Sequence, residues 1–155
     1  MRIGWIIATT LLLAPPAGAL AAGDACSLLT DAQVSSTLGA PTEPGSRIGN
    51  LATSCQWLGK GKYATLTANN TIGGKTALER FEPGKKSALA GITVEPVSGV
   101  GDDAYYVYYT GTTRTGLGLV VKKGNSAFEV RVYGFEIDKG KPVAKALAQI
   151  VAGKL

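Results

Sequence analysis

The stretch from Asp102 to Phe135, DDAYYVYYTGTTRTGLGLVVKKGNSAFEVRVYGF, decides the fold. It predicts three consecutive β-strands, at Ala104–Thr110, Leu117–Lys122 and Ala127–Phe135. Apolar and polar residues alternate along the strands, which is typical of an antiparallel sheet with one face in the core. Between the last two strands lies Lys123-Gly124-Asn125-Ser126. A Gly-Asn pair at such a place predicts a hairpin, because Gly accepts the positive φ of a tight turn.

The first of these strands carries four tyrosines, two on each face. Tyr106 and Tyr108 share one face, and Tyr105 and Tyr109 share the other. We expect one pair in the core and the other pair exposed, where tyrosines often form recognition surfaces. Cross-strand stacking that only supports the sheet explains the same pattern, so both interpretations stay open. The candidate binding surface comprises Trp57, Tyr105, Tyr106, Tyr108, Tyr109 and Tyr133.

Upstream of this stretch the sequence predicts a short helix and two more strands. Thr30 and Gln33 have the spacing of a capping box, and Gly39 suits the left-handed position that ends a helix. The strands are expected at Thr53–Leu58 and Tyr63–Asn69.

The remaining elements are two helices and an edge strand. A helix is expected at Thr76–Glu82, stopped by Pro83-Gly84. Ile92–Val97 is expected as an edge strand. An amphipathic helix is expected from about Pro142, at its first position, to Ala152. The fold class is therefore α+β, with a five- to six-stranded antiparallel sheet packed by N-terminal and C-terminal helices.

The N-terminus has the pattern of a secretory signal peptide. Arg2 precedes the apolar run Ile3–Leu13, and small residues follow up to Ala21-Ala22. We expect cleavage after Ala21, with cleavage after Ala22 as the close alternative, and residues 22–155 as a single domain. The apolar run is shorter than the about 20 residues that span a bilayer, so no membrane span is expected after cleavage. The protein is expected in the periplasm or outside the cell.

The two cysteines, Cys26 and Cys55, are expected to form a disulfide, because an even number in an exported chain favours pairing. The residues before Cys26 do not match a lipid-attachment site. A metal site is not expected, since the chain has no His and no C-x-x-C spacing.

Charge and motifs give no catalytic residues and no cofactor. Lys and Arg number 16 against 11 Asp and Glu, a mild excess without the interleaved aromatics of a nucleic-acid surface. Gly74-Lys75-Thr76 resembles the end of a P-loop, but Asn69 stands where the first Gly is required. Gly99–Asp103 holds only two carboxylates, too few for calcium. We expect Asp102 to accept backbone N–H groups instead.

Four motifs resemble the signposts of small exported bacterial domains of unknown function, many of them actinobacterial lipoproteins. In order they are Asp24-Ala25-Cys26-Ser27-Leu28-Leu29-Thr30, Leu38-Gly39, Cys55-Gln56-Trp57 and Gly99-Val100-Gly101-Asp102-Asp103-Ala104-Tyr105. The resemblance implies a PsbP-like α/β/α sandwich, with the sheet between helices, and no catalytic residues. The present chain differs in lacking the lipid-attachment cysteine.

These observations favour a non-enzymatic binding or accessory module of the bacterial cell envelope. Its partner would be an envelope protein or a small ligand, of unknown identity. One alternative is a small envelope hydrolase that uses Asp/Glu or Lys. The other is a structural envelope protein.

Overall fold

A seven-stranded antiparallel sheet forms the centre of the molecule, in the order β1-β2-β3-β9-β8-β7-β6. The computed structural model describes residues 23–111 and 116–155; the expected signal peptide, residues 1–21, lies outside them. The strands of the sheet are β1 (Ser46–Arg47), β2 (Ser54–Leu58), β3 (Tyr63–Ala68), β6 (Ile92–Val97), β7 (Asp103–Tyr109), β8 (Leu117–Lys123) and β9 (Ser126–Tyr133). The other elements are the 3₁₀ turn η1 (Ala25–Ser27), the helices α1 (Asp31–Leu38), α2 (Ala77–Lys85) and α3 (Ile137–Ala152), and the hairpin β4 (Thr71–Ile72) with β5 (Lys75–Thr76).

Strand pairing defines two faces, because residues opposite each other in neighbouring strands point to the same side. On the first face lies the row Cys55, Leu66, Val130, Leu119 and Tyr106. On the second face lies the row Gln56, Thr65, Arg131, Gly118 and Val107.

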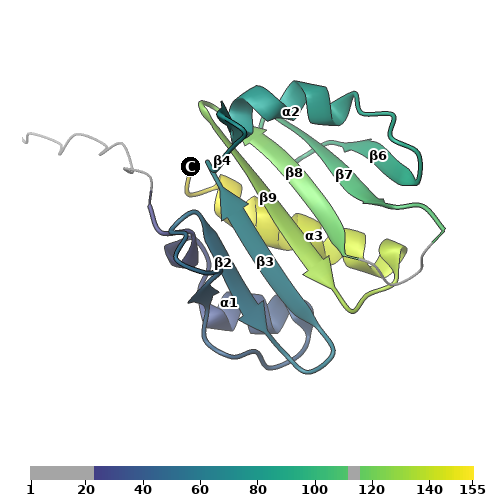
Figure 1. Ribbon diagram of the computed structural model, residues 1–155. Coiled ribbons are helices and arrows are strands. Elements are labelled where there is room, and N and C mark those ends of the chain that lie inside the picture. Colours follow the sequence, from purple (N-terminus) through teal and green to yellow (C-terminus); the bar gives the residue numbers. More distant parts are fainter. Residues whose placement is uncertain (1–22, 112–115) are drawn as a thin grey trace, which may run out of the picture.

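The first face holds the main core. Its large side chains, among them Trp57, Leu66, Leu119 and Val130, are fully buried. Figure 1 shows α1 and α3 behind the sheet, where they cover this face. The buried stripe of α3 includes Ala144, Leu147, Ala148 and Val151, so the helix packs across the sheet as its amphipathic pattern predicted.

The second face is covered only in part. Phe81 of α2 is buried against Tyr105, which points to the second face of β7, with ring centroids 5.2 Å apart. Figure 1 shows α2 at one end of β7, β8 and β9. This helix has nine residues, and no other helix within residues 23–111 and 116–155 lies over the rest of the second face.

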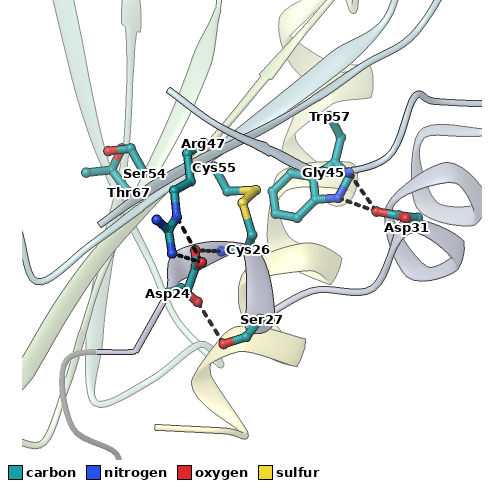
Figure 2. The surroundings of a disulfide bond; sticks show 10 residues. All are labelled: Asp24, Cys26, Ser27, Asp31, Gly45, Arg47, Ser54, Cys55, Trp57 and Thr67. Carbon is teal, nitrogen blue, oxygen red and sulfur yellow. Dashed lines mark hydrogen bonds and ion pairs between the residues drawn. A yellow bond between two sulfur atoms is a disulfide. The ribbon is translucent and has the colours of Figure 1, made fainter. Parts of the chain in front are cut away.

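The disulfide joins Cys26 in η1 to Cys55 in β2. Figure 2 shows Asp24 beside it, where its carboxylate accepts hydrogen bonds from the Cys26 backbone N–H and from the Arg47 guanidinium. The Arg47 hydrogen bond and charge, together with the Cys26 N–H, hold the pKa of Asp24 below its usual value. The N-terminal segment is thereby tied to β2 both covalently and electrostatically.

Most of the expected elements are confirmed. Both cysteines pair, and β7, β8 and β9 form the meander with Gly124 at φ 55° in the turn. Thr30 and Gln33 form the capping box, and Gly39 ends α1 at φ 64°. Asp102 accepts a backbone N–H, that of Gly124 in the neighbouring hairpin.

The expected strand number and two helix boundaries are wrong. The sheet has seven strands, because Ser46–Arg47 pairs with β2 inside a segment rich in Pro and Gly. Helix α2 continues through Pro83 to Lys85. The φ of proline fits a helix, and its cost, a lost hydrogen bond and a clash with the carbonyl four residues earlier, falls in the last turn of this helix. Helix α3 begins at Ile137, where Lys139 and Gly140 bond to the Glu136 carbonyl, which leaves Pro142 inside the helix.

Breaking the disulfide should destabilise the fold by about 3–4 kcal/mol in the chain-entropy model for a loop of 29 residues. Urea unfolding with and without a reductant measures the difference. The double variant Cys26→Ala/Cys55→Ala should show the lower stability and no response to the reductant. Free thiols in the oxidised, mature protein would contradict the pairing.

Candidate functional site

A cavity of about 570 Å³ lies between α2, the β4–β5 hairpin and the second face of the sheet. Apolar side chains and a few polar groups line it together, as in most small-molecule sites. Its wall includes Ile72, Lys75, Arg80, Phe81, Tyr105, Val120 and Glu129.

The hairpin and α2 form one unit at the cavity wall. Gly73 and Gly74 both have positive φ, as a tight two-residue turn requires. Thr76 then caps α2 in a reciprocal pair with Glu79. The Arg80 guanidinium reaches back and donates to the Asn70 side-chain oxygen at 2.7 Å and to the Asn70 and Lys75 carbonyls. The position of the hairpin is therefore fixed from the helix.

Tyr105 supplies a buried polar group to the cavity. Its side chain belongs to a residue that is 5% exposed, and burial, together with the charge of Glu129, raises the pKa of its hydroxyl to about 12. The hydroxyl is therefore neutral at physiological pH. Among residues 23–111 and 116–155 it makes no hydrogen bond, and its oxygen is accessible from the cavity, so it can donate to or accept from a ligand.

Glu129 is the one carboxylate on the cavity wall within the described chain. Arg131, two residues along β9, donates to it through Nε at 3.0 Å. A Cβ at Gly118 would lie 2.4 Å from the Glu129 Oε1 and 2.8 Å from Val107. The absence of a side chain at Gly118 thus gives this ion pair its place over β8.

Beside the cavity the second face continues as an open strip, which we define as Tyr63, Tyr109, Arg131 and Tyr133. The Tyr63 and Tyr133 rings stack with centroids 4.1 Å apart and planes 7° apart. A Cβ at Gly116 would meet the Tyr133 ring at 2.4 Å, so this ring leans over the glycine. Cross-strand stacking therefore accounts for Tyr133.

The six aromatic residues expected to form one surface are distributed over both faces. Trp57 is fully buried on the first face, where its Nε1 donates to the Asp31 carboxylate at 3.0 Å (Figure 2). Tyr106 is also in the core, with its hydroxyl bonded to the Lys141 carbonyl at 3.0 Å. Tyr108 is half-buried there and donates to Glu95. These three residues do not contribute to a surface on the second face.

The other three lie on the second face, but not as an exposed pair. The assignment of Tyr105 and Tyr109 to one side of β7 is confirmed by the register. Tyr105 is covered by α2, whereas Tyr109 is 54% exposed. The expectation that both members of one pair are exposed is wrong at Tyr105, because sequence alternation does not show which face a short helix covers.

The cavity residues Arg80, Val120 and Glu129 were not among the expected site residues. Arg80 and Glu129 are single charged residues in no recognised motif. The signal available in the sequence is the apolar side of the expected helix, Ala77, Leu78 and Phe81, which indicates that the helix packs against another element.

The described residues include no group of three His, Cys, Asp or Glu that could hold a metal ion. In the same part of the chain Lys75 makes no hydrogen bond to Thr67 or Ser87, the hydroxyl residues of the cavity wall. No helix within residues 23–111 and 116–155 has the length and apolar character needed to cross a bilayer.

Comparisons of the chain with protein-family models, curated proteins and solved structures gave no match.

Replacing Tyr106 by Ala should destabilise the protein by about 3–5 kcal/mol, as for other large core aromatics. Replacing the exposed Tyr109 by Ala should cost about 1 kcal/mol or less. Urea unfolding of both variants checks the assignment of the two faces. Equal losses in the two variants would contradict it.

The raised pKa of Tyr105 predicts a loss of stability at alkaline pH. Because the folded state holds this proton more tightly, the free energy of unfolding is unaffected below about pH 10 and falls as the pH rises from about 10 to 12. Tyr105→Phe should lack this part of the alkaline decline. Urea unfolding at about pH 8 and about pH 11 measures the difference, and parallel declines in wild type and variant would contradict the assignment.

Proposed function

We propose that the protein is a non-enzymatic, exported binding module of the bacterial cell envelope, and that it binds a small ligand in the cavity under α2. The observation that carries the proposal is the Tyr105 hydroxyl, which lines this cavity without a partner in the described chain. No fully buried side-chain N or O atom of the described chain lacks a partner, so this hydroxyl reaches the open space of the cavity, where it can bond to water or to a ligand. A ligand with a polar atom near Tyr105 would take this bond from water.

The proposed location rests on two features. The Cys26–Cys55 disulfide is compatible with an oxidising compartment, and residues 1–21 have the pattern of a signal peptide. The PsbP-like α/β/α arrangement is part of the same proposal, and the presence of α3 and α2 on opposite faces of the sheet supports it.

A binding module has more support than a hydrolase that uses Asp/Glu or Lys. General acid–base chemistry requires a base within hydrogen-bond reach of the group it activates. The cavity wall offers one carboxylate, Glu129, which is paired with Arg131. A purely structural envelope protein would give no role to the cavity or to the polar groups that line it.

The test fills the cavity with a larger side chain. It then measures binding of an uncharged aromatic probe, N-phenyl-1-naphthylamine, by fluorescence. Val120 is half-buried on the cavity wall, so Val120→Phe should weaken probe binding by about tenfold or more, as expected when a ligand loses its place in an apolar site.

The matched control is Val107→Phe. Val107 is also half-buried on the second face but lies outside the cavity wall, so this variant should bind the probe like the wild type. Absence of saturable binding to the wild type, or equal binding by Val120→Phe, would contradict the proposed function.

A further inference from the structure

The cavity wall carries two cations without a carboxylate partner. Ion pairs hold Arg47, Lys85, Lys123, Arg131, Lys139 and Lys141, whereas the other cations of the described chain form none. Lys75 and Arg80, which line the cavity, form none within the described residues. Glu79, the neighbouring acid in sequence, is occupied by capping α2 through the N–H and hydroxyl of Thr76. Two positive charges at the cavity are therefore not neutralised by a carboxylate in contact with them.

Arg80 is held in place by neutral oxygen atoms. Its three hydrogen bonds go to the Asn70 carbonyl, the Asn70 side chain and the Lys75 carbonyl. A guanidinium has five N–H donors, so two remain after these three. The charge is thus held in a fixed orientation with donors left over, which suits a planar or tetrahedral anion.

The rest of the wall is largely apolar. Phe81 and Val120 contribute apolar surface, and Ile72 of the hairpin is 61% exposed. An exposed Ile beside an apolar cavity gains when an apolar group covers it. Glu129 does not oppose an anion strongly, because its charge is paired with Arg131.

We propose that the cavity takes a small amphipathic anion. Its apolar or aromatic body would lie against Phe81, Val120 and Ile72, and its single anionic group would bind Arg80 and Lys75. The Tyr105 hydroxyl would add one hydrogen bond. This inference rests on the proposed function and adds the chemical class of the ligand.

The experiment compares two fluorescent probes with the same aromatic body. 8-Anilinonaphthalene-1-sulfonate carries one negative charge, on its sulfonate group, and N-phenyl-1-naphthylamine is uncharged. Lys75→Gln should weaken binding of the sulfonate by about tenfold, the value of one charge-assisted hydrogen bond, and should leave the uncharged probe within about twofold. Arg80→Gln should weaken the sulfonate by about tenfold or more, and because Arg80 also holds the hairpin it should weaken the uncharged probe as well.

Controls separate charge from folding. Lys86 is exposed and lies outside the cavity wall, so Lys86→Gln should bind both probes like the wild type. The Arg80 side chain also supports the hairpin, and replacement by Gln removes both this support and the charge. Arg80→Lys keeps the charge, so it should retain more sulfonate binding than Arg80→Gln. Lys75 makes no side-chain hydrogen bond in the described part of the chain, which makes Lys75→Gln the cleaner of the two tests.

The two sets of variants test the ligand class and the binding cavity separately. If Lys75→Gln and Arg80→Gln leave sulfonate binding unchanged while Val120→Phe abolishes binding of both probes, the anionic class is overturned and the binding cavity stands. If Val120→Phe binds both probes like the wild type, the cavity itself is overturned. Displacement of the bound sulfonate by decanoate supports a lipid-like anion, displacement by 1-naphthoate supports an aromatic one, and displacement by neither overturns the inference.

Discussion

The alternation of side chains across the sheet is the constraint on which the rest of the structure depends. Seven antiparallel strands present two faces, and a face that carries Leu, Val and Trp side chains has to be covered. Helices α1 and α3 cover the first face. In the part of the chain that the structure describes, the helix over the second face is α2, whose nine residues lie at one end of β7, β8 and β9. The cavity and the open strip are what this unequal coverage leaves.

The N-terminal helix is too short to hold its own position. Eight residues form about two turns, and isolated helices of that length are marginal in water. The Cys26–Cys55 bond fixes the chain just upstream of α1, and Asp31 in its first turn accepts hydrogen bonds from Trp57 and from the Gly45 N–H. A Cβ at Gly45 would lie 2.5 Å from the Trp57 Nε1, so the loop lies directly on the indole. Two of the motifs that carried the family resemblance therefore meet in the main core on the first face. They are the one around Cys26 and Cys55-Gln56-Trp57.

Local patterns predicted the elements well, and tertiary contacts decided what the patterns missed. The capping box at Thr30, the hairpin at Gly124 and the edge strand with Pro96 all depend on neighbours in sequence. Strand β1 has two residues and depends on its pairing with β2, so it leaves no periodic pattern. The cavity could not be predicted from the sequence either. Arg80, Tyr105 and Glu129 come together because α2 packs on the second face of the sheet. This packing is set by the fit of Phe81 against Tyr105, not by spacing along the chain.

The continuation of α2 through Pro83 explains how the cavity is held open at a fixed width. The extra turn brings Gly84 to the Tyr105 hydroxyl, where a Cβ would lie only 2.3 Å from the oxygen. Helix and sheet therefore meet as closely as a glycine permits at this point. Near the start of the helix the spacing is set instead by the hairpin, which Arg80 ties to α2 through Asn70 and Lys75. The group that fixes the wall also presents the positive charge, so recognition of an anion and support of the cavity depend on the same side chain.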